Sequence, residues 1–334
     1  MQILRKLLFP FSILYGIIVG LRNKFFDWGI LASASYDFPV ITVGNLSMGG
    51  TGKSPMIEYL IELLKPNYQL GTLSRGYKRK TKGFLLLDAK NEAKDVGDEP
   101  LQFKRKFPEV RVAVDEDRQH GIGELRALKK PPEVILLDDA YQHRKVKAGF
   151  SILLTACNEL YSKDMILPAG NLREPAFGAH RADVVIVTKC PLKISEKEKK
   201  KIAKDLNIKA HQKLFFTAIH YEDYFTNGMQ QIPMQLMEDF NLVTGIAKPQ
   251  PLVNHLKENG LNVKHFSYPD HHLFTEKELE SLRKESLLVT TEKDFMRLKD
   301  HFPLEKLFYL PIKTVFLAHK EEFDQQIMRF VAQA

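Results

Sequence analysis

The sequence contains few cysteines, and their spacing suits neither a disulfide framework nor a structural metal. Cys157 and Cys190 are the two among 334 residues, and neither belongs to a C-x-x-C pair. Disulfide-stabilised domains and zinc sites use several cysteines at characteristic spacings. The sequence therefore argues against both, and two unpaired thiols indicate a reducing, cytoplasmic compartment.

The sequence also lacks a hydrophobic run long enough to cross a membrane. Residues 7–21 form an uncharged stretch of fifteen residues, which as a helix spans about 22 Å against a hydrocarbon core of about 30 Å. No small-x-small cleavage site follows it, which argues against a secretory signal. We predict that residues 1–28 form an interfacial helix, the alternative being a helix packed on the core. Cations flank the stretch, where anionic headgroups attract them: Arg5, Lys6, Arg22 and Lys24.

Low-complexity tracts and internal repeats are absent too, and the composition is that of an ordinary α/β protein, with 44% hydrophobic and 27% charged residues. The length predicts about two domains. A net charge of +8 favours an anionic partner, such as a nucleotide, a phospholipid surface, a phosphorylated substrate or a nucleic acid. Because the lysines are interspersed with glutamates rather than concentrated with aromatic residues, we predict no nucleic-acid partner.

What the sequence does contain is a glycine-rich turn between a strand and a helix. Residues 41–56, ITVGNLSMGGTGKSPM, have the context of a P-loop, the alternative being a plain glycine-rich turn. In a P-loop, Lys53 reaches the β- and γ-phosphates and the Ser54 hydroxyl binds Mg²⁺. Ser47 stands where the usual first glycine would be. The predicted nucleotide-binding residues are Ser47, Met48, Gly49, Gly50, Thr51, Gly52, Lys53 and Ser54.

A second nucleotide-site feature lies at residues 134–143, VILLDDAYQH. Four apolar residues in succession predict a strand buried on both faces, and Asp138 stands at its carboxyl end with Asp139 beside it. A Walker-B carboxylate in that place binds Mg²⁺. An isolated strand followed by two acids is common, but together with the P-loop it indicates that Asp138 is a metal ligand.

Two further loops carry side chains suited to ligand contacts. At the end of a predicted strand, Arg75 suits a phosphate and Tyr77 a sugar ring, the alternative being a solvated turn. The loop over residues 167–175 is rich in turn formers, and its Arg173 and Glu174 suit a phosphate and a metal, respectively.

Strands and helices alternate up to about residue 210, which predicts a doubly wound parallel sheet of the P-loop NTPase class. The remainder predicts a second, smaller α/β domain. We expect an interfacial helix over 1–28, a P-loop domain over 29–212, an extended linker over 213–235 and the smaller domain over 236–334.

A GTPase switch or a metal-delivery protein of the same fold group is the main rival interpretation. The segment from Val185 to Lys189 is similar to the guanine-binding T-K-x-D pattern of such proteins. Pro191 stands where the discriminating carboxylate belongs, and proline cannot accept the pair of hydrogen bonds that a guanine edge donates. The sequence therefore favours ATP over GTP.

Taken together and in this order, the motifs resemble the tetraacyldisaccharide 4'-kinases, the lipid A 4'-kinases of Gram-negative bacteria. The resemblance covers nearly the whole chain, and the loop of that family also lacks the first glycine. It rests on the apolar N-terminal stretch and on VGNLSMGGTGKSP, LSRGYKRK, VGDEP, LLDDAYQHRK, LPAGNLREP, TGIAKP, PDHHLF and TTEKDFMRL.

The resemblance implies an activity and a location. It implies transfer of the γ-phosphoryl group of ATP, with Mg²⁺, to the 4'-hydroxyl of an acylated glucosamine disaccharide 1-phosphate. The enzyme would work at the cytoplasmic face of the inner membrane, attached peripherally through residues 1–24.

The resemblance also assigns roles to single residues. Asp98 would be the general base and His271 its partner across an interdomain cleft; by their surroundings alone, Asp98 is equally a helix N-terminal charge and His271 a structural histidine. The remaining assignments are Lys53, Asp139 and Arg173 as catalytic residues, Ser54, Asp138 and Glu174 as metal ligands, and Arg75, Tyr77, Asn171 and Glu174 as substrate contacts.

Overall fold

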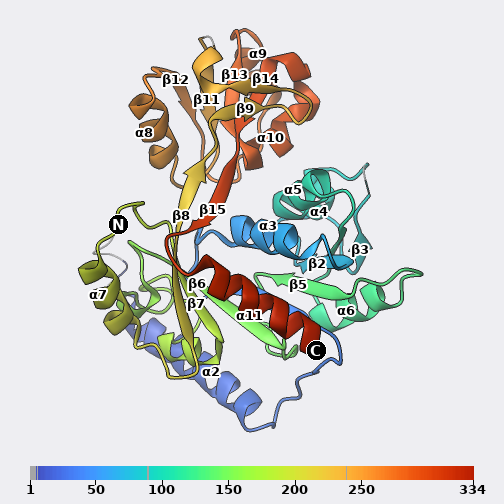
Figure 1. The fold of residues 1–334 in the computed structure, drawn as a ribbon, viewed down its shortest axis with the longest axis vertical. Helices are drawn as coiled ribbons and strands as arrows, with labels where there is room; N and C mark the ends of the chain where they lie inside the picture. The colour runs from blue at the N-terminus through green and yellow to red at the C-terminus, as the bar shows by residue number, and fades with distance from the viewer. Residues whose placement is uncertain (1–4, 6, 89, 238) are drawn as a thin grey trace.

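The computed structural model describes residues 5, 7–88, 90–237 and 239–334, and within them the larger sheet has nine strands (Figure 1). Their order is β15-β8-β7-β6-β1-β5-β2-β4-β3, and all but the two edge strands run parallel. The predicted doubly wound parallel sheet is confirmed. The strands are β1 (Val40–Asn45), β2 (Leu70–Ser74), β3 (Leu85–Leu86), β4 (Arg111–Val114), β5 (Val134–Asp138), β6 (Phe150–Ala156), β7 (Val184–Thr188), β8 (Lys213–Tyr221) and β15 (Ile312–Phe316).

A second sheet forms the core of the smaller domain, which stands above the larger one in Figure 1. In the described residues it has six strands in the order β10-β9-β14-β13-β11-β12, of which the last four are mutually parallel. The strands are β9 (Tyr224–Thr226), β10 (Gln231–Pro233), β11 (Asn241–Thr244), β12 (Lys264–Ser267), β13 (Leu288–Thr291) and β14 (Leu307–Leu310).

Helices cover both faces of the larger sheet, which explains why its central strands are apolar throughout. Every residue of β1, β5 and β7 is buried, as expected for parallel strands between two helical layers. Helices α3, α5 and α11 contribute to the core on one face, and α6 and α7 to the cores on the other. The bounds are α3 (Lys53–Leu64), α4 (Ala93–Val96), α5 (Asp98–Lys106), α6 (Arg118–Arg126), α7 (Glu196–Leu206) and α11 (Lys320–Gln333).

Among the described residues, three α-helices complete the smaller domain, and short 3₁₀ helices occur in both domains. The bounds are α8 (Gln250–Glu258), α9 (Glu276–Arg283), α10 (Glu292–Leu298), η1 (Tyr161–Lys163), η2 (Ala176–Arg181), η3 (Met234–Leu236), η4 (Lys299–His301) and η5 (Leu304–Lys306).

The C-terminus belongs to the larger domain, so the predicted extent of the smaller one, 236–334, is corrected. Strand β15 pairs antiparallel with β8 at the edge of the larger sheet, and α11 lies across that sheet (Figure 1). The predicted linker over 213–235 also differs, because β8 is a full strand of the larger sheet and β9 and β10 belong to the smaller. The smaller domain is therefore inserted between β8 and β15.

Helix α2 (Phe9–Asp27) is the predicted N-terminal helix, and it lies on the surface of the larger domain. Lys6, one of the predicted flanking cations, lies outside the described residues, as do residues 1–4. Within the described part of the chain, none of the helices combines the length and the apolar character needed to traverse a bilayer.

The packing of α11 gives a stability prediction. Phe323 is fully buried, with its ring centroid 4.7 Å from that of Phe316 and 5.4 Å from that of Phe215. Because truncation of a buried phenylalanine leaves a cavity, Phe323→Ala should lower the free energy of unfolding by about 3–5 kcal/mol, measured by urea unfolding. Glu321→Ala, at an exposed position of the same helix, is the control. Equal stability of the two variants would contradict the assignment of α11 to the core.

Candidate active site

The P-loop connects β1 to the N-terminus of α3. Its conformation requires glycine at two positions, because Gly49 has φ 112° and Gly52, the N-cap of α3, has φ 86°. The side-chain amide of Asn45 donates a hydrogen bond to Gly49 O at 3.4 Å. The loop thus leads into the N-terminus of α3, where the first backbone N–H groups have no partner within the helix. A glycine-rich loop followed by a helix N-terminus is the arrangement that binds a polyphosphate.

Ser47, in place of the usual first glycine, does not adopt a conformation that requires glycine. It is buried, it has no positive φ, and it pairs with Leu172 through an isolated antiparallel bridge. The next residue, Met48, donates its N–H to Asn171 O at 2.7 Å. The first half of the P-loop is thus held by the loop over residues 164–174.

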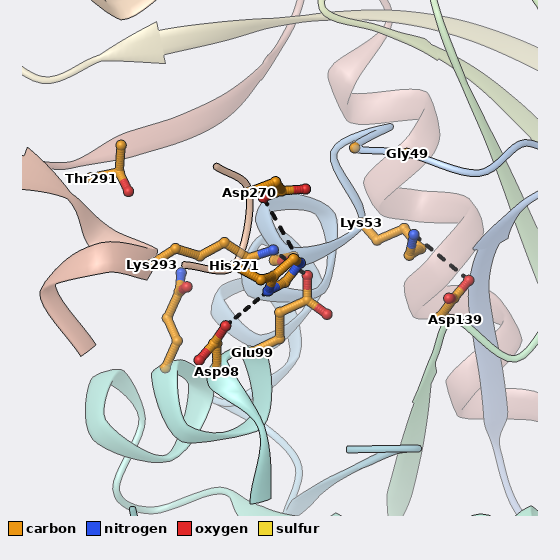
Figure 2. A network of polar contacts seen from close by, with 12 residues as sticks. Gly49, Lys53, Asp98, Glu99, Asp139, Asp270, His271, Thr291 and Lys293 are labelled. Carbon is orange, nitrogen blue, oxygen red and sulfur yellow. Dashed lines mark hydrogen bonds and ion pairs between the residues drawn. The ribbon is translucent and has the colours of Figure 1, made fainter. Parts of the chain in front are cut away.

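Three of the predicted catalytic residues lie together where β5 ends. Lys53 Nζ is 3.6 Å from Asp139 Oδ1 (Figure 2), and Arg173 donates to both oxygens of that carboxylate at 2.7 and 3.0 Å. Burial alone would raise the pKa of Asp139, but Lys53 and Arg173 outweigh it and hold that pKa below the ordinary value. Two cations therefore converge beside the P-loop, an arrangement that can neutralise the charge of a phosphate.

Asp138 fits a divalent cation. Its side chain is buried, and Oδ1 has no hydrogen-bond partner among the described residues. Burial and the nearby Glu99 raise its pKa, so a cation at this place would favour the ionised carboxylate. Mg²⁺ binds through one or two carboxylates plus phosphate oxygens, and Asp138 can supply one such carboxylate. In the described part of the chain, no group of three or more His, Cys, Asp or Glu side chains is arranged to hold a metal.

Glu99 links the P-loop helix to the smaller domain. Ser54 Oγ donates to Glu99 Oε1 at 3.2 Å, and Lys293 Nζ, from α10, donates to the same oxygen at 2.6 Å (Figure 2). Burial would raise the pKa of Glu99, but Lys293 and Lys53 hold it below the ordinary value. The carboxylate is therefore ionised between two lysines, one from each domain.

Asp98, the residue before Glu99, meets His271 across the boundary between the domains. His271 Nδ1 is 2.9 Å from Asp98 Oδ2 (Figure 2). Arg297 donates to the same oxygen from Nε at 3.0 Å and also from a terminal nitrogen. Burial raises the pKa of Asp98, but His271 and Arg297 outweigh burial and hold it well below the usual value. The predicted base and its partner are thus in contact.

The interface between α5 of the larger domain and the α10 region of the smaller one is largely charged. Its ion pairs are Asp98–Arg297, Glu99–Lys293, Lys106–Glu292 and Arg105–Asp300. Polar interdomain interfaces of this kind are typical of domains that move relative to each other.

The predicted substrate contacts do not form one cluster. Tyr77 is exposed and its ring centroid lies 5.5 Å from that of His271. Arg75 is exposed on the same turn. Asn171 instead lines a separate cavity of about 340 Å³ with Ser47 and the residues after β6. Tyr77 is the one that lies beside the Asp98–His271 pair.

Comparisons with known proteins agree with this geometry. The family model described as tetraacyldisaccharide-1-P 4'-kinase matches residues 4–332. The chain belongs to that family. The tetraacyldisaccharide 4'-kinase of Flavobacterium johnsoniae is 50% identical over 99% of this chain and 98% of its own length. That of Bacteroides fragilis is 45% identical over 98% and 93%.

A solved structure is similar over the whole chain. The crystal structure of the "apo" form of LpxK from Aquifex aeolicus in complex with ATP has 33% identity and a TM-score of 0.80, covering 98% of this chain and 99% of that one. The resemblance predicted from the motifs is confirmed, and the chain is a kinase. A GTPase switch is not favoured.

Within this family site, Glu174 is not available as a metal ligand or a substrate contact, which corrects the prediction. It is 1% exposed. Both of its oxygens accept from Arg181 at 2.9 Å, and they also accept from Asn23 at 2.6 Å and from Gln142 at 3.0 Å. Although adjacent in sequence, Arg173 points to Asp139 and Glu174 points to α2 and η2. Glu174 therefore anchors the N-terminal helix.

Three charged residues of the kinase site were not predicted from the sequence. Glu99 follows Asp98 in the VGDEP segment, where an acid also suits the N-terminus of a helix. Lys293 and Arg297 belong to the TTEKDFMRL segment, whose position facing α5 depends on the folding of an inserted domain. Their spacing of four residues on one helix, opposite two consecutive acids, is the one sequence signal that relates them to Asp98 and Glu99.

Proposed function

We propose that this kinase transfers the γ-phosphoryl group of ATP to the 4'-hydroxyl of tetraacyldisaccharide 1-phosphate. The observation that carries the proposal is the placement of two consecutive acids at the start of α5. Asp98 contacts His271 of the smaller domain, while Glu99 contacts Ser54 of the P-loop. The proposed base, Asp98, and the residue that contacts the P-loop, Glu99, are therefore consecutive in the sequence.

In this proposal the residues of the chain position the reactants and neutralise charge. Phosphoryl transfer passes through a loose transition state, so positioning and electrostatic stabilisation are the main contributions of a kinase. The amides of the P-loop and Lys53 bind the β- and γ-phosphates, and Arg173 neutralises charge next to Asp139. Asp98 accepts the proton of the attacking hydroxyl.

Mg²⁺ would be held by Ser54 and Asp138 together with phosphate oxygens, and when bound it neutralises charge on the β- and γ-phosphates. Tyr77 lies beside His271, which supports a role for its ring as a contact of the sugar. Arg75, at the end of β2 and exposed, suits a phosphate of the substrate, whereas the role of Asn171 as a substrate contact rests on the family resemblance.

The experiment is to give the purified chain ATP labelled at the γ-phosphate and the acylated disaccharide 1-phosphate in detergent micelles. The proposal expects label in the lipid at the 4' position, dependent on Mg²⁺. Turnover of GTP with no label in the lipid would overturn it in favour of the GTPase switch.

We also propose that the enzyme acts at a membrane surface, at the cytoplasmic face of the inner membrane. Helix α2 turns polar residues inward: Ser12 Oγ accepts from Ala169 N at 2.9 Å, and Tyr15 donates to Arg173 O at 2.9 Å. Most of its apolar residues face outward. The exposed ones are Phe9, Phe11, Ile13, Leu14, Ile17, Ile18, Leu21 and Phe25, and the flanking Leu7, Leu8 and Trp28 are exposed as well.

This arrangement suits a helix lying in a bilayer interface, because water disfavours so large an apolar surface. It also matches an acylated substrate, whose hydrocarbon chains remain in the bilayer. The peripheral attachment through residues 1–24 is therefore supported by the described part of that segment.

Charges on the outer face of α2 should release the enzyme from membranes. Leu14 and Ile18 are 59% and 58% exposed. Since a fully buried aliphatic side chain is worth about 1.5–3 kcal/mol, the double variant Leu14→Glu/Ile18→Glu should bind anionic vesicles at least about tenfold more weakly, measured by vesicle sedimentation. The control is Leu236→Glu/Leu273→Glu, at positions 71% and 82% exposed on the smaller domain. Equal release of both variants would contradict the proposal.

A further inference from the structure

Arg297 is enclosed between the two domains and has no free guanidinium edge. Its side chain is 5% exposed. Nε and one terminal nitrogen donate to Asp98 Oδ2, and the other terminal nitrogen donates to Asp294 Oδ1 at 2.8 Å and to Gly245 O at 3.4 Å. With its donors used in this way, the guanidinium is not placed to bind a phosphate itself.

Asp98 is held by one of its two oxygens. Oδ2 accepts hydrogen bonds from His271 Nδ1 at 2.9 Å and from Nε and one terminal nitrogen of Arg297. Among the described residues none donates a hydrogen bond to Oδ1. The carboxylate is therefore fixed at one end, and its other oxygen is the one free to accept a proton from a substrate hydroxyl.

Arg297 is in turn fixed from behind by Asp294. This carboxylate is fully buried, and its Oδ2 accepts from Gly245 N at 2.9 Å and from Thr291 Oγ1 at 2.7 Å. These contacts tie it to the end of β11 and to the N-cap of α10. Arg297 consequently moves with the smaller domain as a rigid part, and its contact with Asp98 exists only when the domains are together.

We propose that Arg297 is a positioning residue for phosphoryl transfer: with His271 it fixes Asp98 Oδ2 so that Oδ1 is presented to the acceptor hydroxyl. The inference rests on the proposed role of Asp98 as base. The contacts of Arg297 and His271 with one oxygen lower the pKa of Asp98 and make it a weaker base, which would count against a role in proton abstraction. In a loose transition state, however, bond formation to the nucleophile is slight, so the position of the base matters more than its strength.

The test compares Arg297→Met and Arg297→Lys in the full-length chain, with kcat and KM measured for ATP and for the lipid. Because misplacement of a reacting group by about 1 Å costs about 10²-fold, kcat should fall about 10²-fold in Arg297→Met with the KM for ATP within about twofold. Arg297→Lys should recover part of kcat, because it returns a cation to Oδ2 without the two-pronged contact of the guanidinium. Arg283→Met, which removes an arginine paired with Glu276 on the surface of the same domain, is the control and should keep kcat.

A double-variant cycle separates positioning from a structural effect. If Arg297 acts through Asp98, adding Arg297→Met to Asp98→Asn should lower kcat by no more than about threefold, because residues acting as a unit are non-additive. A further loss of about 10²-fold in the double variant would overturn the inference, as would an Arg297→Met enzyme with unchanged kcat. If Arg297→Met does not fold, failure of Arg297→Lys to differ from the wild type in kcat overturns it instead.

The same assay distinguishes this inference from the proposed function. Wild-type enzyme that transfers no phosphoryl group to the lipid refutes the proposed function. Wild-type and Arg297→Met enzymes that transfer equally refute only the positioning role.

Discussion

Asp98→Asn should lower kcat for phosphoryl transfer by about 10³-fold, within the range of about 10²–10⁴ that general base catalysis contributes. Asparagine has the size of aspartate and can still accept a hydrogen bond from His271 or Arg297, but it cannot take up a proton. In the proposed mechanism the P-loop makes the ATP contacts, so the affinity for ATP should change little. Single-turnover transfer of labelled phosphate and equilibrium binding of ATP measure the two quantities separately.

Asp223→Asn is the matched control, because it makes the same change at an exposed position of the smaller domain. It should retain wild-type kcat. An Asp98→Asn enzyme that keeps more than about a tenth of the wild-type kcat would remove Asp98 from the role of base.

Lys53→Met should lower kcat by about 10²–10³-fold, the loss that follows removal of one charged or hydrogen-bonding group at a developing oxyanion. Lys53 is the first residue of α3 and is 13% exposed, so its ammonium group is fixed at the end of the P-loop beside Asp139. Methionine keeps most of the volume and removes the charge. The KM for ATP should rise as well, since lysine contacts the phosphates in both the ground state and the transition state.

The control for this prediction lies at the other end of the same helix. Lys65, the C-cap of α3, pairs with Glu109 at the surface, and Lys65→Met should leave both kinetic constants close to those of the wild type. A Lys53→Met enzyme with wild-type kcat would show that the loop does not serve as the catalytic phosphate site.

Much of the larger domain could be predicted because its strands are buried on both faces. Such strands appear in the sequence as continuous apolar runs, and the predicted buried strand that ends at Asp138 coincides with β5. The P-loop was equally predictable, because its conformation depends on local glycines. Ser47 looked like a departure from the pattern, and its extended pairing with Leu172 explains why a side chain is tolerated there.

Features that depend on distant parts of the chain were not predictable in the same way. Arg297 and Asp98 are 199 residues apart and meet because an inserted domain folds back over the larger one. The return of β15 and α11 to the larger sheet was not predicted for the same reason, because β15 pairs with β8 across the whole inserted domain. The prediction that Glu174 binds a metal or the substrate was wrong for a different reason. The identity of a residue in a loop does not fix the direction of its side chain, and here contacts with Arg181 and Asn23 determine that direction.

The insertion of the smaller domain has a mechanical consequence. The chain leaves the larger sheet in β8 and re-enters it in β15, and these strands pair in register from Ile312 opposite Tyr221 to Phe316 opposite Thr217. A lobe suspended from a single strand can swivel, whereas a two-stranded ribbon resists twisting and in-plane shear and flexes most easily out of its own plane. A hinge of this kind would confine movement of the smaller domain to a tilt about the ribbon, and such a tilt would return His271 and Arg297 along one arc to the same carboxylate oxygen.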